Sequence, residues 1–210
     1  MSFSKEEFAQ KSGVSASALE DYTRWGQLLE KWNPRINLVA PSTLSDYWHR
    51  HAYDSWQIVP YISETTKSVI DLGSGAGFPG LSVAIEMKSR GQGHVTLVES
   101  AGKKVNFLRT VIRSLDLPAT VLNDRAESLT PEPFDLITAR AFAPLPQLLS
   151  YSHPFWGEST RSLFLKGKGL AQEVKQAQKD WVFTYRAHSS LSDETGRLVE
   201  VSNLLRNDVG

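Results

Sequence analysis

Hydrophobic residues are spaced differently in the first third of this chain and in the rest of it. Before Tyr61 they recur at steps of three and four, the spacing that predicts amphipathic helices. From Ser68 onward, short apolar runs of strand length alternate with helical patterns, which indicates a parallel sheet with crossover helices. We therefore predict an N-terminal helical segment, residues 1–66, packed on a core domain, residues 67–210.

The N-terminal segment is predicted to hold three helices. The first runs over Ser4–Ser12 and ends at Gly13, and the second is capped by Ser15. Aromatic residues recur along one face of the second helix. We interpret that face as packing against the core.

Residues 32–40 contain Pro34 between two asparagines, which predicts a structured loop. The third helix is expected over residues 46–61, where it carries His49 and His51. Residues two apart on a helix do not share a face, and no cluster of further ligands lies near them. We therefore predict no metal site.

In the core domain we expect five strands separated by helices and followed by a β-hairpin. The strands are predicted at 68–72, 94–98, 119–122, 134–139 and 162–165, and the hairpin at 181–190 and 197–205. The helices are predicted at 80–89, 103–114 and 170–179. A closing hairpin departs from the simple six-stranded dinucleotide fold. It indicates a seven-stranded, mostly parallel sheet with helices on both faces and an antiparallel last strand.

A glycine-rich stretch connects the first strand to its helix, at residues 68–80. Strand, glycine turn and helix form a nucleotide or nucleoside site, because glycine lets a ligand approach the backbone and the first helical N–H groups face it. Gly75 to Gly80 fits the dinucleotide pattern G-x-G-x-x-G, and Glu99 follows at the expected distance. The residues from Asp71 through Gly77, an acid followed by alternating glycines, instead resemble the first motif of S-adenosylmethionine (SAM) methyltransferases.

Composition narrows the classes of partner. The 23 Lys and Arg residues equal the 23 Asp and Glu residues in number, whereas a nonspecific nucleic-acid binder would be more basic. Any contact with nucleic acid must then come from a local patch or from a structured target. With no cysteine, no secretory signal and no stretch apolar enough to span a bilayer, we expect a soluble, cytoplasmic protein without a membrane partner.

Ligands of such folds bind beyond the carboxyl ends of the strands, so the residues that follow each strand are the candidates. A carboxylate at Glu99 suits the two hydroxyls of a ribose. Ala126 and Glu127 could line an adenine. Arg140 could orient a guanine, a phosphate or the carboxylate of the donor. Alternatively, it could form a salt bridge with one of the strand-end acids, Asp71, Glu99 or Glu127.

Three lysines extend this set. Lys103 and Lys104 stand at a predicted helix N-terminus, where cations oppose the helix dipole, so contact with a polyanion is favoured over a structural role. Lys166 ends the fifth strand and is a weaker candidate of the same kind.

The chain resembles the glucose-inhibited division protein B family, the bacterial small-subunit rRNA guanine-N7 methyltransferases of the G type. The matching segments keep the order of the family: Trp32-Asn33…Asn37-Leu38, Arg50-His51…Asp54-Ser55, Asp71 to Gly80, Val98-Glu99…Lys103-Lys104…Phe107-Leu108, Arg125-Ala126-Glu127, Arg140-Ala141 and Leu165-Lys166-Gly167.

The resemblance implies SAM as donor and a guanine N7 in the 530 loop of 16S rRNA, preferably in the assembled small subunit, as acceptor. It places the donor at the positions matching Gly73, Phe78, Ala126, Glu127 and Arg140. We add Asp71, Gly75, Gly77 and Glu99 to the cofactor site, and expect Lys103, Lys104, Arg140 and Lys166 to orient RNA.

Guanine N7 carries a free lone pair, so no catalytic general base is expected and the task of the protein is alignment. Two alternatives remain open at this stage. One is an NAD-dependent oxidoreductase, and the other is a catalytically silent SAM-binding module.

Overall fold

The computed structural model describes residues 3–207 of the chain. The N-terminal elements are α1 (Lys5–Ser12), α2 (Ala16–Ile36), α3 (Pro41–Leu44), the π-helical turn η1 (Trp48–Tyr53), α4 (Asp54–Trp56) and the 3-10 turn η2 (Val59–Tyr61). The core elements are β1 (Ser68–Leu72), α5 (Gly80–Arg90), β2 (His94–Val98), α6 (Gly102–Leu115), β3 (Ala119–Leu122), η3 (Ala126–Ser128), β4 (Leu136–Arg140), α7 (Leu145–Ser152), η4 (His153–Phe155), β5 (Arg161–Lys166), α8 (Leu170–Ala177), β6 (Trp181–Ser189) and β7 (Arg197–Arg206).

The sheet has seven strands in the order β3-β2-β1-β4-β5-β7-β6. β1 to β5 pair in parallel, and β7 runs antiparallel between β5 and β6. Because the order reverses between β1 and β4, the carboxyl ends of these two strands open a crevice at which such sheets bind ligands. The predicted fold is confirmed, including the antiparallel last strand.

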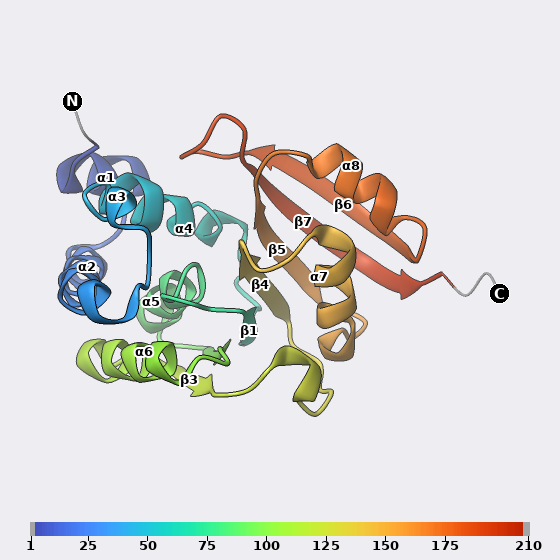
Figure 1. Cartoon of the computed structure of the whole chain (residues 1–210), viewed down its shortest axis with the longest axis horizontal. Coiled ribbons are helices and arrows are strands. Elements are labelled where there is room, and N and C mark those ends of the chain that lie inside the picture. The colour runs from blue at the N-terminus through green and yellow to red at the C-terminus, as the bar shows by residue number, and fades with distance from the viewer. Residues whose placement is uncertain (1–2, 208–210) are drawn as a thin grey trace.

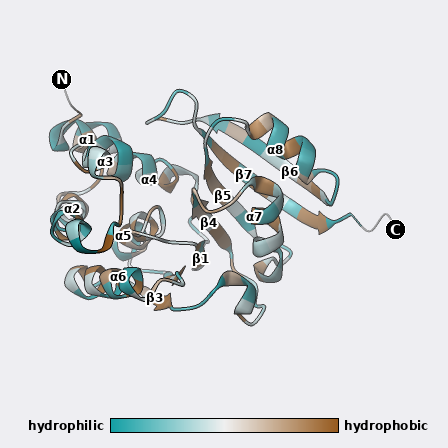
Figure 2. Cartoon of the chain, viewed as in Figure 1, coloured by the Kyte–Doolittle hydropathy of each residue, from teal (hydrophilic) through white to brown (hydrophobic). Residues whose placement is uncertain are grey.

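Helices cover both faces of the sheet (Figure 1). On one face, α2, α5 and α6 share a buried cluster with alternate strand residues such as Val69, Val95 and Leu163. On the other face, α7 and α8 pack on the residues between them, such as Ile70 and Phe164. Apolar residues concentrate along the central strands, whereas the helices show a mixture of apolar and polar positions (Figure 2). This is the pattern expected of strands buried on both sides.

The N-terminal segment differs from the prediction in two places. The helix α2 continues through Pro34 to Ile36, where a loop was predicted. Pro34 lies in the last turn, and Asn37 ends the helix in the left-handed conformation with its N–H bonded to Asn33 O. The Asn33 side chain accepts from Val39 N at 2.9 Å and donates to Val39 O at 3.1 Å, so the asparagines stabilise the helix end.

The single helix predicted over residues 46–61 is likewise wrong, because short segments of different helical type replace it. The π-helical turn η1 lies at its centre, and such turns occur frequently at functional sites.

In the core domain, β1, β2 and β3 have the predicted bounds, and most other elements differ by one or two residues. β4 begins at Leu136 instead of Phe134, because the Phe134 N–H bonds to Phe155 O. The helix α7 was not predicted. The division into two domains stays a prediction, since the N-terminal helices and the sheet share one hydrophobic cluster. Among residues 3–207, no helix is long and apolar enough to cross a membrane.

Candidate functional site

Two cavities lie at the edge of the sheet where the parallel strands end, and Ala141 lines both of them. The first, which we call the glycine-loop cavity, has a volume of about 410 Å³ and its wall includes Gly73, Gly75, Glu99, Ala126, Glu127 and Phe142. The second, the arginine cavity, has a volume of about 310 Å³ and its wall includes Arg50, Asp54, Arg140, Lys166, Ser192 and Arg197.

The glycine loop follows β1 and forms one side of the first cavity. Gly73 and Gly75 have φ angles of +68° and +58°, which residues with a Cβ rarely adopt. At Gly75 an added Cβ would meet nothing nearer than Gly73 O at 3.9 Å, so the space above this residue is open to a ligand. Gly73 is different, because the ring of Phe142 lies where its Cβ would be.

Glu99 directly follows β2 and holds the glycine loop in place. Its Oε2 accepts from the Gly75 N–H at 2.9 Å, and its Oε1 accepts from the Ala101 N–H at 2.8 Å. The residue is only 8% exposed, yet it lines the cavity. Each carboxylate oxygen has a second lone pair, so Glu99 can hold the loop and still accept from a ligand hydroxyl.

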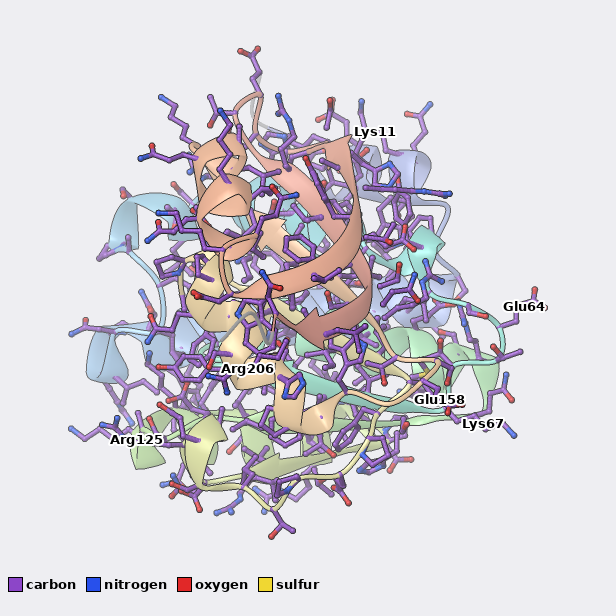
Figure 3. All side chains as sticks on the ribbon, turned by 90° about the vertical axis from the view of Figure 1, so that its right-hand side faces the viewer. Lys11, Glu64, Lys67, Arg125, Glu158 and Arg206 are labelled. Carbon is purple, nitrogen blue, oxygen red and sulfur yellow. The ribbon has the colours of Figure 1, made fainter. Side chains whose placement is uncertain are left out.

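Ala126 and Glu127 belong to the turn η3 and also line the glycine-loop cavity. Ala126 is buried, whereas Glu127 is exposed. The neighbouring Arg125 extends outward at the periphery of the molecule (Figure 3). This turn therefore presents a small apolar residue beside a carboxylate, as expected of a wall that faces a planar ring with an exocyclic amine.

Four predicted cofactor residues, Asp71, Gly77, Phe78 and Arg140, lie outside the wall of the glycine-loop cavity, and Arg140 lines the arginine cavity instead. Asp71 is fully buried, and its Oδ1 accepts from Thr138 Oγ1 at 2.7 Å. No hydrogen bond to its Oδ2 is found among the described residues, and burial raises the pKa of this carboxyl to about 6. A Cβ on Gly80 would lie 2.6 Å from that oxygen, so the Asp71 side chain packs directly against the first residue of α5.

Phe78 is sandwiched between aromatic rings. Its ring stacks on Trp25 at 4.6 Å and on His51 at 4.8 Å between centroids. The guanidinium carbon of Arg140 lies 4.8 Å from the centre of the same ring, within the range of a cation–π contact. Phe78 therefore connects the glycine loop to α2, to η1 and to the end of β4.

Arg140 ends β4 and lines the arginine cavity. Its Nη1 donates to Asp54 Oδ2 at 2.6 Å and to Arg50 O at 3.1 Å, and its Nη2 donates to His51 Nδ1 at 3.1 Å. Arg140 thus forms a salt bridge, but its partner is Asp54 of the N-terminal segment and not one of the strand-end acids expected from the sequence.

The predicted RNA-binding cations divide between the two cavities. Lys104 lines the glycine-loop cavity, and Lys103 is exposed beside it at the start of α6. Lys166 lines the arginine cavity, donates to Ala143 O at 2.8 Å and pairs with Glu173 at 2.8 Å. Lys166 is therefore held within the protein, while the other two lysines remain accessible.

Comparison with known proteins decides the family. The family model described as GidB, rRNA small subunit methyltransferase G, matches residues 18–198. A ribosomal RNA small subunit methyltransferase G of Paramagnetospirillum magneticum is 43% identical over 201 residues, which cover 96% of each chain. One from Bartonella tribocorum is 44% identical over 193 residues, 91% of this chain and 90% of the relative. The chain belongs to this family.

Solved structures show the same fold at low sequence identity. A TehB-like SAM-dependent methyltransferase from Corynebacterium glutamicum superposes with a TM-score of 0.57 at 12% identity, covering 87% of this chain and 98% of the other. The pyocyanin biosynthetic protein PhzM gives a TM-score of 0.60 at 11% identity, covering 82% of this chain and 61% of the other. At such identities the likeness concerns the fold alone.

Membership of the methyltransferase G family confirms the predicted class of enzyme and its cofactor, SAM. The glycine-loop cavity fits that cofactor, because open space above Gly75, a carboxylate at Glu99 and the turn η3 meet there. The alternative of an NAD-dependent oxidoreductase has no support. The first-turn N–H groups of α5, expected to face the ligand, lie outside this cavity, because α5 contributes no residue to its wall.

Several residues of the two cavities were not predicted. Arg50, Arg197 and Ser192 line the arginine cavity, and Phe142 and Tyr151 line the glycine-loop cavity. Arg50 stands within a segment that carries the family resemblance, which could have drawn attention to it. The others lie on loops, on α7 or, for Arg197, at the start of β7, and their positions relative to the cavities depend on tertiary packing. Within residues 3–207, no group of three or more His, Cys, Asp and Glu residues could hold a metal ion.

Proposed function

We propose that the protein transfers a methyl group from SAM to N7 of a guanine in the 530 loop of 16S rRNA. One observation carries this proposal in a chain of the methyltransferase G family: a cavity suited to SAM adjoins a cavity lined by cations, and Ala141 belongs to both. The relatives named above are small-subunit rRNA methyltransferases, which supports an RNA acceptor.

In the glycine-loop cavity, we assign the ribose of the cofactor to Glu99 and its adenine to Ala126 and Glu127. Gly75 provides close approach to the backbone, and Gly73 makes room for the ring of Phe142, which lines the same cavity. Asp71, Gly77 and Phe78 lie outside the cavity wall and pack behind the glycine loop, so we assign them an indirect contribution to cofactor binding. When bound, SAM supplies a methyl group already activated on a sulfonium.

In the arginine cavity, we assign the acceptor to a surface rich in positive charge. Four cations line it, Arg50, Arg140, Lys166 and Arg197, against the two carboxylates of Asp54 and Asp193. The chain as a whole has no net charge, so this is a local concentration of positive charge. Arginine forks suit phosphates and guanine oxygens, and arginine stays protonated at all physiological pH values.

Methyl transfer to guanine N7 needs no general base, because this nitrogen carries a lone pair and no proton. The histidine at the arginine cavity fits that requirement. Both ring nitrogens of His51 have partners, Arg140 at Nδ1 and Thr43 at Nε2. Burial and the nearby arginines lower the pKa of His51 to about 3, so it stays neutral. We infer that the residues of the site align the acceptor and exclude water.

The acceptor that we propose is the guanine within the small ribosomal subunit. A chain without net positive charge gains little from naked phosphates, so shape and the local cations of the arginine cavity must select the target. An rRNA substrate is consistent with a cytoplasmic location.

A transfer assay tests this proposal. Small subunits and naked 16S rRNA, both from cells that lack this gene, are incubated with the protein and SAM carrying a labelled methyl group. We expect label in the RNA of the subunits and much less in naked rRNA. SAM binding without transfer to either acceptor would favour the catalytically silent module instead.

A further inference from the structure

A single turn of the N-terminal segment holds the guanidinium of Arg140. Three acceptors of this turn, Arg50 O, His51 Nδ1 and Asp54 Oδ2, lie within 3.1 Å of its two terminal nitrogens. The Arg140 side chain is 19% exposed, so these contacts are shielded from most solvent. A charge-assisted bond in such a place is stronger and better directed than one on the surface.

The tautomer of His51 matches this arrangement. Thr43 Oγ1 donates its proton to Ala40 O at 2.8 Å, so it must accept from His51 Nε2 at 3.0 Å. The proton of the neutral ring therefore lies on Nε2, and Nδ1 is free to accept from Arg140. The stack of His51 on Phe78 fixes the plane of the ring.

Asp54 also reaches the turn of the β6–β7 hairpin. Its Oδ1 accepts from Ser192 Oγ and, at 2.9 Å, from Gln57 Nε2. Gln57 is 2% exposed, and its Oε1 accepts from the Leu191 N–H at 2.9 Å. Asp54 thus joins three parts of the chain that are far apart in the sequence: the N-terminal segment, the end of β4 and the hairpin turn.

These contacts leave part of the guanidinium available. Arginine carries five N–H donors, of which three are used by Arg50 O, His51 and Asp54. The Nε–H and one Nη2–H have no hydrogen-bond partner among residues 3–207, in a side chain that lines the arginine cavity. Two free donors on one planar group can bind a carbonyl or phosphate oxygen of an RNA acceptor.

We propose that Asp54 and His51 are positioning residues for Arg140, holding its guanidinium over Phe78 so that its free donors orient the RNA acceptor. This deepens the proposed function and rests on it, because it assigns the N-terminal segment a part in the reaction site. Both residues line the arginine cavity, and we assign their effect to their contacts with Arg140. Misplacing a positioning group by about 1 Å can lower a rate on the order of 100-fold.

The test compares Asp54→Asn with Asp46→Asn. Both variants exchange an acid for its amide on the same segment, but Asp46 lies 3.8 Å from His49 and does not contact Arg140. Turnover on small subunits, the KM for SAM and the melting temperature are measured for each. We expect Asp54→Asn to lower kcat at least about 10-fold with the KM for SAM nearly unchanged, because a positioning group acts on the bound complex. Asp46→Asn should behave like the wild type.

A double-mutant cycle with Arg140→Ala separates positioning from folding. If Asp54 acts through Arg140, Asp54→Asn has no further effect in the Arg140→Ala background. The affinity for the small subunit is measured for the same four proteins. Where a variant turns over too slowly to measure kcat, this affinity is compared instead. If Asp54→Asn does not fold, His51→Phe takes its place, since it keeps the stack on Phe78 and removes the acceptor.

Two results would overturn the proposal. One is a wild-type kcat in Asp54→Asn or, where that variant does not fold, in His51→Phe. The other is an equal loss from the substitution in both backgrounds of the cycle. Failure of the proposed function looks different, because the wild-type protein itself would then leave the subunits unlabelled.

Discussion

Glu99 illustrates how one side chain can serve the fold and the site together. Its two oxygens accept from the N–H groups of Gly75 and Ala101, and so they fix the glycine loop against the end of β2. The charge of the carboxylate strengthens both bonds. The residue that we assign to the ribose therefore also holds the loop that we propose binds the cofactor.

Replacing Glu99 by glutamine should weaken SAM binding. The amide keeps the shape but loses the charge, and bonds to charged groups contribute about 1.5–3 kcal/mol. We expect the Kd for SAM to rise on the order of 10-fold or more, measured by titration calorimetry. Glu132→Gln, at an exposed acid outside both cavities, is the matched control. Equal SAM affinity in the two variants would contradict the role of Glu99.

Gly73 and Gly13 are a second matched pair for substitution by alanine, because their φ angles are nearly equal, +68° and +66°. An alanine at Gly13 meets nothing within 4 Å, whereas at Gly73 it meets the ring of Phe142. We expect Gly13→Ala to lower the free energy of unfolding by about 1–2 kcal/mol, the strain of that conformation, and to leave SAM affinity intact.

Gly73→Ala should lose more stability than Gly13→Ala and should also bind SAM poorly, since the displaced Phe142 lines the cavity. Chemical denaturation and calorimetry measure the two effects. Wild-type SAM affinity in Gly73→Ala would show that the packing of Phe142 against Gly73 does not shape the donor site.

At the scale of elements, the turn of the β6–β7 hairpin is fastened to the N-terminal segment by Gln57. The turn lies beside this segment in Figure 1, and Gln57 bonds to both Leu191 N and Ser190 Oγ. The hairpin itself was predictable from its strands and its polar turn. Its contact with Gln57, 134 residues away in the sequence, was not, because no local pattern encodes so distant a pairing.

We expect Gln57→Leu to free this turn without unfolding the sheet. Loss of the bond to the Leu191 N–H should speed amide exchange in residues 190–196 about 5-fold, since a hydrogen bond contributes about 1 kcal/mol. Hydrogen exchange read by mass spectrometry measures it. The exposed Gln178→Leu serves as control, and unchanged exchange in Gln57→Leu would show that other contacts hold the turn.

The strands could be predicted from sequence because short, mostly apolar segments rich in Val, Ile and Leu, such as SVIDL at β1 and HVTLV at β2, are distinctive. The N-terminal segment could not be predicted in the same detail. A π-helical turn replaces the regular helix at η1, where the aromatic rings of Tyr53 and His51 pack on their neighbours. Tertiary packing decides such a segment, and propensity does not.

The candidate site could be predicted only in part, because some of its contacts follow from the strand order and others depend on tertiary packing. Each residue at a strand end was accessible to reasoning from topology, so Glu99, Ala126 and Glu127 meet at one cavity as expected. Arg140 and Asp54 meet across 86 residues, and only the fold shows that pairing. Local sequence patterns do not predict which polar side chains from distant segments will form hydrogen bonds with each other.

At the scale of the whole molecule, His51 makes stability depend on pH. Its pKa is about 3 in the folded protein, lowered first by burial and then by Arg140 and Arg50. In the unfolded chain it is about 6.5. Protons therefore bind the unfolded chain more strongly between these values, and stability that is present above pH 6.5 is lost as the pH falls.

The free energy of unfolding at pH 7 and pH 5 tests this effect, by comparison of the wild type with His51→Phe. The raised pKa of Asp71 acts in the opposite direction in both proteins and cancels in the comparison. On lowering the pH, the wild type should lose about 2 kcal/mol relative to the variant. Equal changes in the two proteins would show that His51 takes up a proton while folded.

The central claim concerns the whole molecule, namely that two adjoining cavities bring SAM and a guanine of 16S rRNA together. The most direct measurement maps the methyl group after reaction with small subunits from cells that lack this gene. Our account predicts one labelled guanine, in the 530 loop, with the methyl group on N7. Label at another base or on another atom of the guanine, or no label from a protein that still binds SAM, would contradict it.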